Sequence, residues 1–214
     1  MNRILDALRS APPGVFNQYA EADPLVDLGD AALRRLANVQ SYLEAFAGAR
    51  FVLIGEAAGY RACRFSGVPF TDEHQLVGPA PLWWAGQERG FARCSRAERP
   101  LLREASAGVI WRGLGQRRDI ALWNVVPWHP PGRRGSLSNG LPNSAARAAG
   151  LTVLRLTLET VWPGARPLAV GRIAEQALRE LGLSAPLYVR HPAHGGTATF
   201  LAGLLAHCPG RSAQ

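Results

Sequence analysis

Four short apolar runs, separated by segments long enough to form helices, constrain the fold of this chain more than any other feature. The runs cover residues 51–54, 119–126, 167–170 and 187–190. Short apolar runs of this kind are typical of strands that are buried on both faces of a sheet. Because a helix-length segment separates each run from the next, the pattern predicts a parallel sheet whose faces are covered by helices.

The segments between the runs have helical patterns. Residues 30–47 place their leucines and Phe46 on one face, and residues 143–161 predict a longer helix with Asn143 as its cap. Further helices are predicted over 101–114, 171–181 and 197–207, and a polar loop over 130–142. We therefore expect one domain over residues 1–214, with a three-layer αβα fold around a central four-stranded parallel sheet.

The composition is that of a chain able to bury a sizeable core. Apolar residues make up 47% of the 214 residues, and 24 basic against 16 acidic residues give a formal charge of +8. A basic surface suits nucleic acid as a partner, although a basic protein without such a partner fits the charge equally well. No apolar run reaches the length of a membrane span, and the amphipathic start of the chain does not resemble a signal peptide. We expect a cytoplasmic protein with no membrane partner, and the sequence leaves its oligomeric state open.

Metal and cofactor sites are not expected. Cys63, Cys94 and Cys208 are widely spaced and form no CxxC pair, so the sequence predicts neither a zinc site nor an iron–sulfur cluster. The cysteines are expected to be reduced and partly buried. His191 and His194 have the spacing of metal ligands, but no third ligand is evident.

Small and polar residues lie where the predicted strands end. The segment 55–59, which contains Glu56, follows the first strand, Asn124 lies at the end of the second, and His191 follows the fourth. A loop of small residues lets backbone amides approach a flat ligand or a phosphate. Because ligands bind at the carboxyl ends of parallel strands, we expect these three residues to share one site.

Four segments resemble motifs of the uracil-DNA glycosylase superfamily. GEAAG at 55–59 is similar to the GEAPG motif of family 4, and GVPF at 67–70 to its GxPF motif. NVVPWHPPG at 124–132 is similar to NVVKCRPPG, and HP at 191–192 begins the HPS motif. The segments occur in the family's order, although a glycine-rich loop alone would equally suit a nucleotide phosphate.

The resemblance implies a monofunctional enzyme that flips uracil or a related deaminated base out of DNA and hydrolyses its N-glycosidic bond, within base excision repair. Glu56 would stabilise the sugar cation and hold the water, and His191 would donate to the departing base. Asn124 would read the base edge and Phe70 would stack on the base. The pocket would be completed by Gly55, Ala57, Gly59 and Tyr60, and DNA would contact His194, Gly195 and Gly196.

The chain also departs from the family's pattern. Ala58 replaces the proline of GEAPG, Gly59 stands where family 1 has a tyrosine, and the cysteines of the family 4 cluster are missing. The second motif has no large apolar residue at its tip, so we expect single-stranded or mismatched DNA to be preferred. Two alternatives remain: a non-catalytic nucleic-acid-binding module that retains the fold, and a nucleotide or nucleoside hydrolase.

Overall fold

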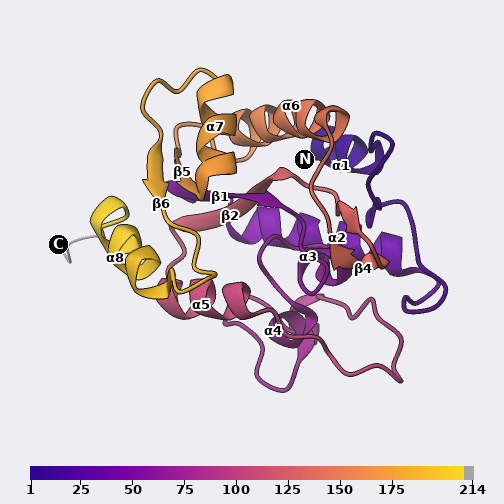
Figure 1. The fold of residues 1–214 in the computed structure, drawn as a ribbon. Helices are drawn as coiled ribbons and strands as arrows, with labels where there is room; N and C mark the ends of the chain where they lie inside the picture. Colours follow the sequence, from indigo (N-terminus) through magenta and orange to yellow (C-terminus); the bar gives the residue numbers. More distant parts are fainter. Residues whose placement is uncertain (210–214) are drawn as a thin grey trace.

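The computed structural model describes residues 1–209, and a four-stranded parallel sheet in the order β2-β1-β5-β6 forms its centre (Figure 1). Its strands are β1 (Phe51–Ala57), β2 (Ile120–Val126), β5 (Arg166–Val170) and β6 (Leu187–Val189). A second, antiparallel pair consists of β3 (Pro131–Gly132) and β4 (Gly135–Asn139). The four apolar runs of the sequence thus form the four strands of the central sheet.

Helices cover both faces of this sheet (Figure 1). One layer contains α1 (Asn2–Arg9), α6 (Ser144–Thr160) and α7 (Arg172–Glu180), and the other contains α2 (Ala31–Ala45), α5 (Ala105–Leu114) and α8 (Thr197–His207). Three short helices lie between β1 and α5 along the chain: α3 (Cys63–Ser66), α4 (Glu73–Val77) and the 3-10 helix η1 (Gln87–Arg89). This arrangement confirms the predicted three-layer αβα fold. Within residues 1–209, no helix combines the length and the apolar character needed to cross a bilayer.

Helix α6 shows how single residues fix a helix on the sheet. The Asn143 side chain accepts a hydrogen bond from the backbone N–H of Ala146 at 2.8 Å, as expected of the predicted cap. Gly150 faces β2 so closely that a Cβ atom there would lie 2.4 Å from the carbonyl oxygen of Val125. The missing side chain therefore lets α6 lie directly on β2, the strand that carries Asn124.

Three sequence predictions need correction. The helix expected from residue 101 begins at Ala105, because the Glu104 carboxylate caps it by accepting from the N–H groups of Ser106 and Ala107. The loop expected over 130–142 contains the β3–β4 hairpin, whose turn ends at Gly135 with a φ of 59°. Strand β1 extends to Ala57, so Glu56 lies on the strand and not in a loop after it.

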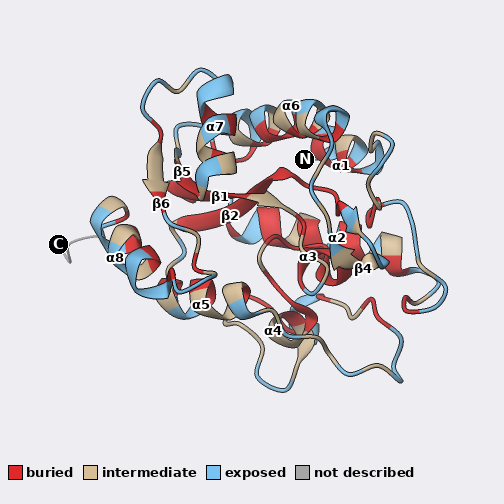
Figure 2. Cartoon of the chain, viewed as in Figure 1, coloured by how far each residue is buried: buried red, intermediate tan, exposed pale blue. Residues whose placement is uncertain are grey.

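The buried residues gather around the sheet (Figure 2), and they include an ion-pair network as well as apolar side chains. Arg35 and Arg64 approach the same oxygen of Asp27 at 2.6 and 2.5 Å, and all three side chains are fully buried. The Arg64 guanidinium also lies over the rings of Phe16 and Phe65, at 4.5 and 4.2 Å from their centroids. The network fastens the N-terminal segment to α2 and α3. The three cysteines are buried and unpaired.

Asp27→Ala should lower the free energy of unfolding by roughly 3–5 kcal/mol, because two buried guanidinium groups would lose their only shared carboxylate partner. Chemical denaturation followed by circular dichroism measures the change. Asp6→Ala, which removes the exposed partner of Arg9, is the matched control and should have little effect. A small effect of Asp27→Ala would show that the network does not hold these segments together.

Candidate active site

Neighbouring strands bring the predicted residues to one edge of the sheet. β1 and β2 pair in a parallel register that sets Gly55 opposite Asn124, and Glu56 is the next residue of β1. β5 pairs with the other side of β1, and β6 with β5, so that β6 leads into His191 at the same edge. The site therefore lies at the carboxyl ends of the strands, as the sequence predicts.

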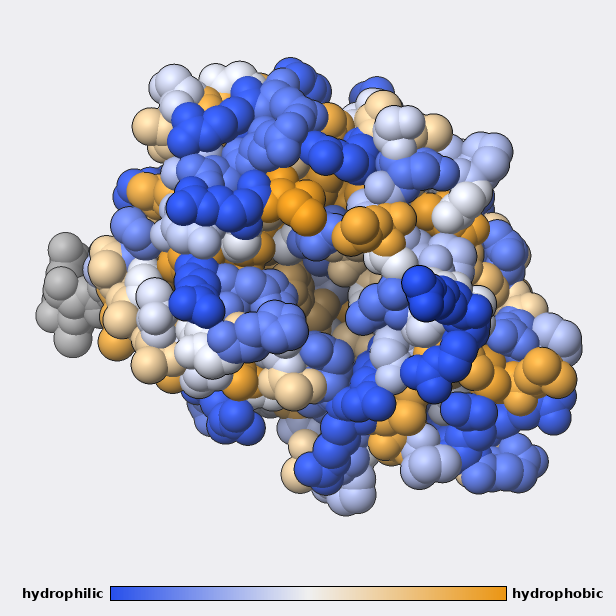
Figure 3. All heavy atoms as spheres, in the orientation of Figure 1, coloured by the Kyte–Doolittle hydropathy of each residue, from blue (hydrophilic) through white to orange (hydrophobic). Residues whose placement is uncertain are grey.

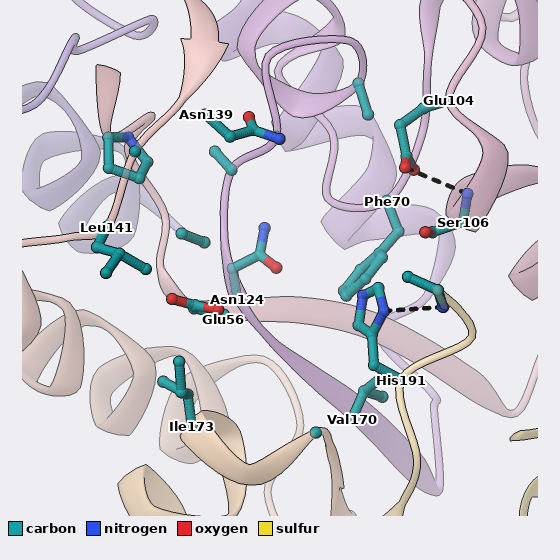
Figure 4. Close-up of a pocket in the computed structure, with 18 of the residues that line it drawn as sticks. Glu56, Phe70, Glu104, Ser106, Asn124, Asn139, Leu141, Val170, Ile173 and His191 are labelled. Atoms are coloured by element: carbon teal, nitrogen blue, oxygen red, sulfur yellow. Dashed lines mark hydrogen bonds between the residues drawn. The ribbon is translucent and has the colours of Figure 1, made fainter. Parts of the chain in front are cut away.

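A cavity of about 750 Å³ opens at this edge, and the surface is hollowed there between hydrophilic and hydrophobic side chains (Figure 3). Figure 4 shows the Glu56 carboxylate and the Asn124 amide on one side of it and the rings of Phe70 and His191 on the other. The predicted residues that line this cavity are Glu56, Ala57, Gly59, Phe70, Asn124 and His191.

Phe70 is held in an uncommon backbone conformation beside the strand end. Its φ is 51°, a left-handed value that is unfavourable for a bulky residue, and its carbonyl oxygen accepts a hydrogen bond from the Trp111 indole at 3.0 Å. The ring lies directly against Gly55, where a Cβ atom would come within 2.1 Å of its Cζ atom. Gly55 thus packs against the ring, and the hydrogen bond from Trp111 fixes the backbone of Phe70.

The Asn124 amide is buried but not satisfied. Its residue is 2% exposed, and its Oδ1 atom has no hydrogen-bond partner among the described residues. A buried acceptor without a partner costs about 1–3 kcal/mol, and natural structures rarely retain one without a reason. A ligand that brings its own N–H group into the cavity would remove that cost.

The tautomer of His191 follows from its surroundings. Its Nδ1 atom accepts a hydrogen bond from the backbone N–H of Ala193 at 3.1 Å, which leaves the proton on Nε2. Burial lowers the pKa of this imidazole, and the nearby carboxylate of Glu104 only partly offsets that effect. His191 is therefore a neutral ring that can donate a hydrogen bond from Nε2.

Glu56 is half-buried, and burial raises the pKa of its carboxyl above the ordinary value of 4.5. The positive charge of Arg147 on α6 acts in the opposite direction and lowers that pKa. Because the net shift is upward, the carboxylate is lost at a higher pH than an exposed glutamate would require. Above that range Glu56 carries a negative charge, on the side of the cavity opposite the neutral His191.

Five predicted site residues do not line the cavity: Gly55, which lies against the Phe70 ring, and Tyr60, His194, Gly195 and Gly196. The guanidinium of Arg61 lies over the ring of Tyr60, 5.2 Å from its centroid. The backbone N–H of Tyr60 donates a hydrogen bond to Oδ1 of Asn139, a lining residue, at 2.9 Å. His194 and Gly195 form an exposed turn with left-handed backbones. Gly196 is buried, and it is closely packed, since a Cβ there would lie 2.1 Å from the carbonyl oxygen of His191.

Several lining residues were missed by the sequence analysis: Glu104, Asn139, Leu141, Arg172 and Ile173. Arg172 and Ile173 follow the end of β5, so the strand-end rule applied to the third strand would have found them. Glu104 carried a signal as an acid just before a helix start, which the misplaced boundary at residue 101 concealed. Asn139 and Leu141 belong to the hairpin region that was expected to be a loop.

His129 contacts the backbone of the loop after β1 and helps to fix its position. Its ring Nδ1 lies 2.7 Å from the carbonyl oxygen of Ala58, and burial lowers the pKa of its imidazole.

Within residues 1–209, no group of three histidine, cysteine, aspartate or glutamate side chains is arranged to hold a metal ion. Comparison with known proteins adds no relative, since neither a protein-family model nor a curated protein matches the chain.

Gly55→Ala should displace the Phe70 ring, because the added methyl group has no space against it. We expect weaker ligand binding and a lower melting temperature, measured by calorimetry. Gly59→Ala is the matched control: a Cβ there meets no atom within 4 Å, and the protein should keep its stability. Equal effects of the two substitutions would contradict the role assigned to Gly55.

Proposed function

We propose that this protein is a monofunctional DNA glycosylase that removes uracil, or a related deaminated base, from a flipped-out nucleotide. The observation that carries the proposal is the convergence of Glu56, Asn124 and His191 on one cavity beside the Phe70 ring. These side chains supply a carboxylate, a planar amide and a neutral N–H donor. Together with an aromatic face they match what a pyrimidine base and its sugar require.

Base recognition would rest on Asn124 and Phe70. The amide can accept the N3–H of uracil at Oδ1, its unsatisfied atom, and donate from Nδ2 to the O4 oxygen. Cytosine presents the reverse pattern at these two positions. The Phe70 ring offers a flat face on which the base can stack once it has left the helix.

Residues on the two sides of the cavity would have different roles in bond cleavage. As the N-glycosidic bond breaks, positive charge develops on the sugar and negative charge on the departing base. Glu56 would stabilise the sugar cation and orient the attacking water, while His191 would donate from Nε2 to a base oxygen. A neutral histidine suits this role. Its Nε2–H group donates to the base oxygen before the bond breaks, and this hydrogen bond becomes stronger as the base becomes anionic.

Arginine side chains near the cavity support a polyanionic substrate. A second cavity of about 640 Å³ shares Glu104 with the first and is lined by Arg61, Arg103 and Arg112. None of these three arginines forms an ion pair with a residue between 1 and 209. Guanidinium groups recognise phosphate through paired N–H donors, so this surface would favour a nucleic-acid strand.

The absence of lysine supports a monofunctional reaction. Glycosylases that also cut the strand form a Schiff base through an amine, and this chain has no lysine side chain to supply one. Release of the base by water would then leave the abasic strand intact. Single-stranded or mismatched DNA should react best, because less stacking and pairing is lost when the base flips.

Excision of uracil from a labelled oligonucleotide tests the proposed chemistry. Under single-turnover conditions, Glu56→Gln should slow base release by roughly 100- to 10,000-fold. His191→Ala should slow it by roughly 100- to 1,000-fold. Both variants should still bind the strand, since they remove reacting groups and leave the basic surface intact.

The same assay as a function of pH provides an internal check. Only the ionised carboxylate can stabilise a sugar cation, so the rate should fall as the pH falls through the raised pKa of Glu56. The fall in rate on the acidic side of the pH profile should therefore be centred above the ordinary glutamate pKa of 4.5.

The control for these substitutions is Arg155→Gln, which changes an exposed residue of α6 and should leave uracil excision normal. Wild-type rates in Glu56→Gln would exclude Glu56 as the catalytic carboxylate.

Base selectivity tests Asn124 separately. Asn124→Asp replaces the donor that faces O4 with an acceptor, so uracil excision should fall by at least roughly tenfold while slow cytosine excision becomes possible. Gly59 leaves open space in the cavity, and the wild type should accept 5-hydroxymethyluracil. Gly59→Tyr should exclude that base and retain uracil. Unchanged uracil excision by Asn124→Asp would remove Asn124 from the site.

A further inference from the structure

One apolar side chain stands exposed at the mouth of the cavity. Leu141 lines the cavity and is nevertheless 83% exposed. Three other large apolar residues are comparably exposed, but Leu25, Leu33 and Leu205 do not line it. Single exposed leucines are common and need no explanation, so the position of Leu141 is the informative feature.

The chain holds Leu141 firmly on both sides. Before it, the N–H of Gly140 donates to the Pro130 carbonyl at 2.9 Å, and a Cβ on Gly140 would lie 2.3 Å from the Pro131 carbonyl oxygen. After it come Pro142, whose ring fixes its backbone, and Asn143, which donates to the Pro13 carbonyl at 3.0 Å. An exposed leucine on such a tied segment is presented at a fixed place.

The same hairpin region also carries positively charged side chains. Arg133 and Arg134 occupy the exposed turn between β3 and β4, and neither forms an ion pair with the described part of the chain. Arginines beside an exposed apolar side chain suit DNA, where phosphates attract the cations and the base stack accepts an apolar side chain. The Tyr60 ring is less suited to entering the stack, because the Arg61 guanidinium lies over it.

We propose that Leu141 inserts into the base stack of duplex DNA and fills the gap left by the nucleotide whose base enters the cavity. The inference rests on the proposed glycosylase function and adds a residue responsible for opening the duplex. In a single strand there is no such gap to fill. Leu141 should therefore matter for duplex substrates and not for single-stranded ones.

Single-turnover excision on three substrates tests this assignment: single-stranded uracil, uracil opposite guanine and uracil opposite adenine. Leu141→Ala should slow both duplex reactions by roughly 10- to 100-fold, the value of one buried leucine side chain, and change the single-stranded rate by less than about twofold. Leu141→Met should retain most duplex activity, whereas Leu141→Asn, similar in size but polar, should not. Leu25→Ala, with 82% exposure away from the cavity, is the matched control and should behave as wild type.

A second readout separates this inference from the glycosylase proposal. In a Glu56→Gln background, 2-aminopurine placed opposite the uracil should brighten on binding as its stacking is disturbed, and Leu141→Ala should abolish that increase. The signal needs no excision, so it decides the role of Leu141 even if the wild type releases no base. Equal losses on single and double strands, or an unchanged 2-aminopurine signal in Leu141→Ala, would overturn the assignment.

Discussion

The parallel pairing of β1 with β2 is the interaction on which the rest of the site depends. Its register sets Gly55 beside Asn124, and the missing side chain of Gly55 leaves room for the Phe70 ring. A shift of one residue would turn each side chain of β1 to the opposite face of the sheet. The amide, the aromatic face and the Glu56 carboxylate therefore share one cavity because two buried strands are locked in one alignment.

The site carries costs that the surrounding fold must offset. Phe70 has a left-handed backbone, Asn124 Oδ1 is buried without a described partner, and the half-buried Glu56 has a raised pKa. Each feature destabilises the folded protein, and each would favour binding or chemistry on a flat, polar ligand. The close contact of α6 with β2 through Gly150 and the hydrogen bond from Trp111 supply the rigidity that keeps them in place.

The central sheet could be predicted from sequence because a strand buried on both faces leaves a continuous apolar run, as at 51–54. The strand-end rule likewise brought Glu56, Asn124 and His191 together correctly. The start of α5 was missed because Pro100, a residue type common at the start of a helix, indicated an earlier start, whereas the Glu104 carboxylate caps the helix at Ala105. Leu141 could not be predicted, because the role proposed for it follows from exposure at a cavity mouth, and tertiary contacts of Gly140 and Asn143 create that position.

The central claim is that Asn124, Phe70 and His191 form one base-binding site. A crystal structure with a strand carrying uracil on a 2′-fluorinated sugar tests it most directly, because fluorine destabilises the sugar cation and slows hydrolysis. The account predicts an extrahelical uracil stacked on Phe70, with Asn124 bonded to O4 and N3–H and His191 Nε2 bonded to the remaining carbonyl oxygen. A uracil that stays stacked in the strand, or binds outside the cavity, would contradict it.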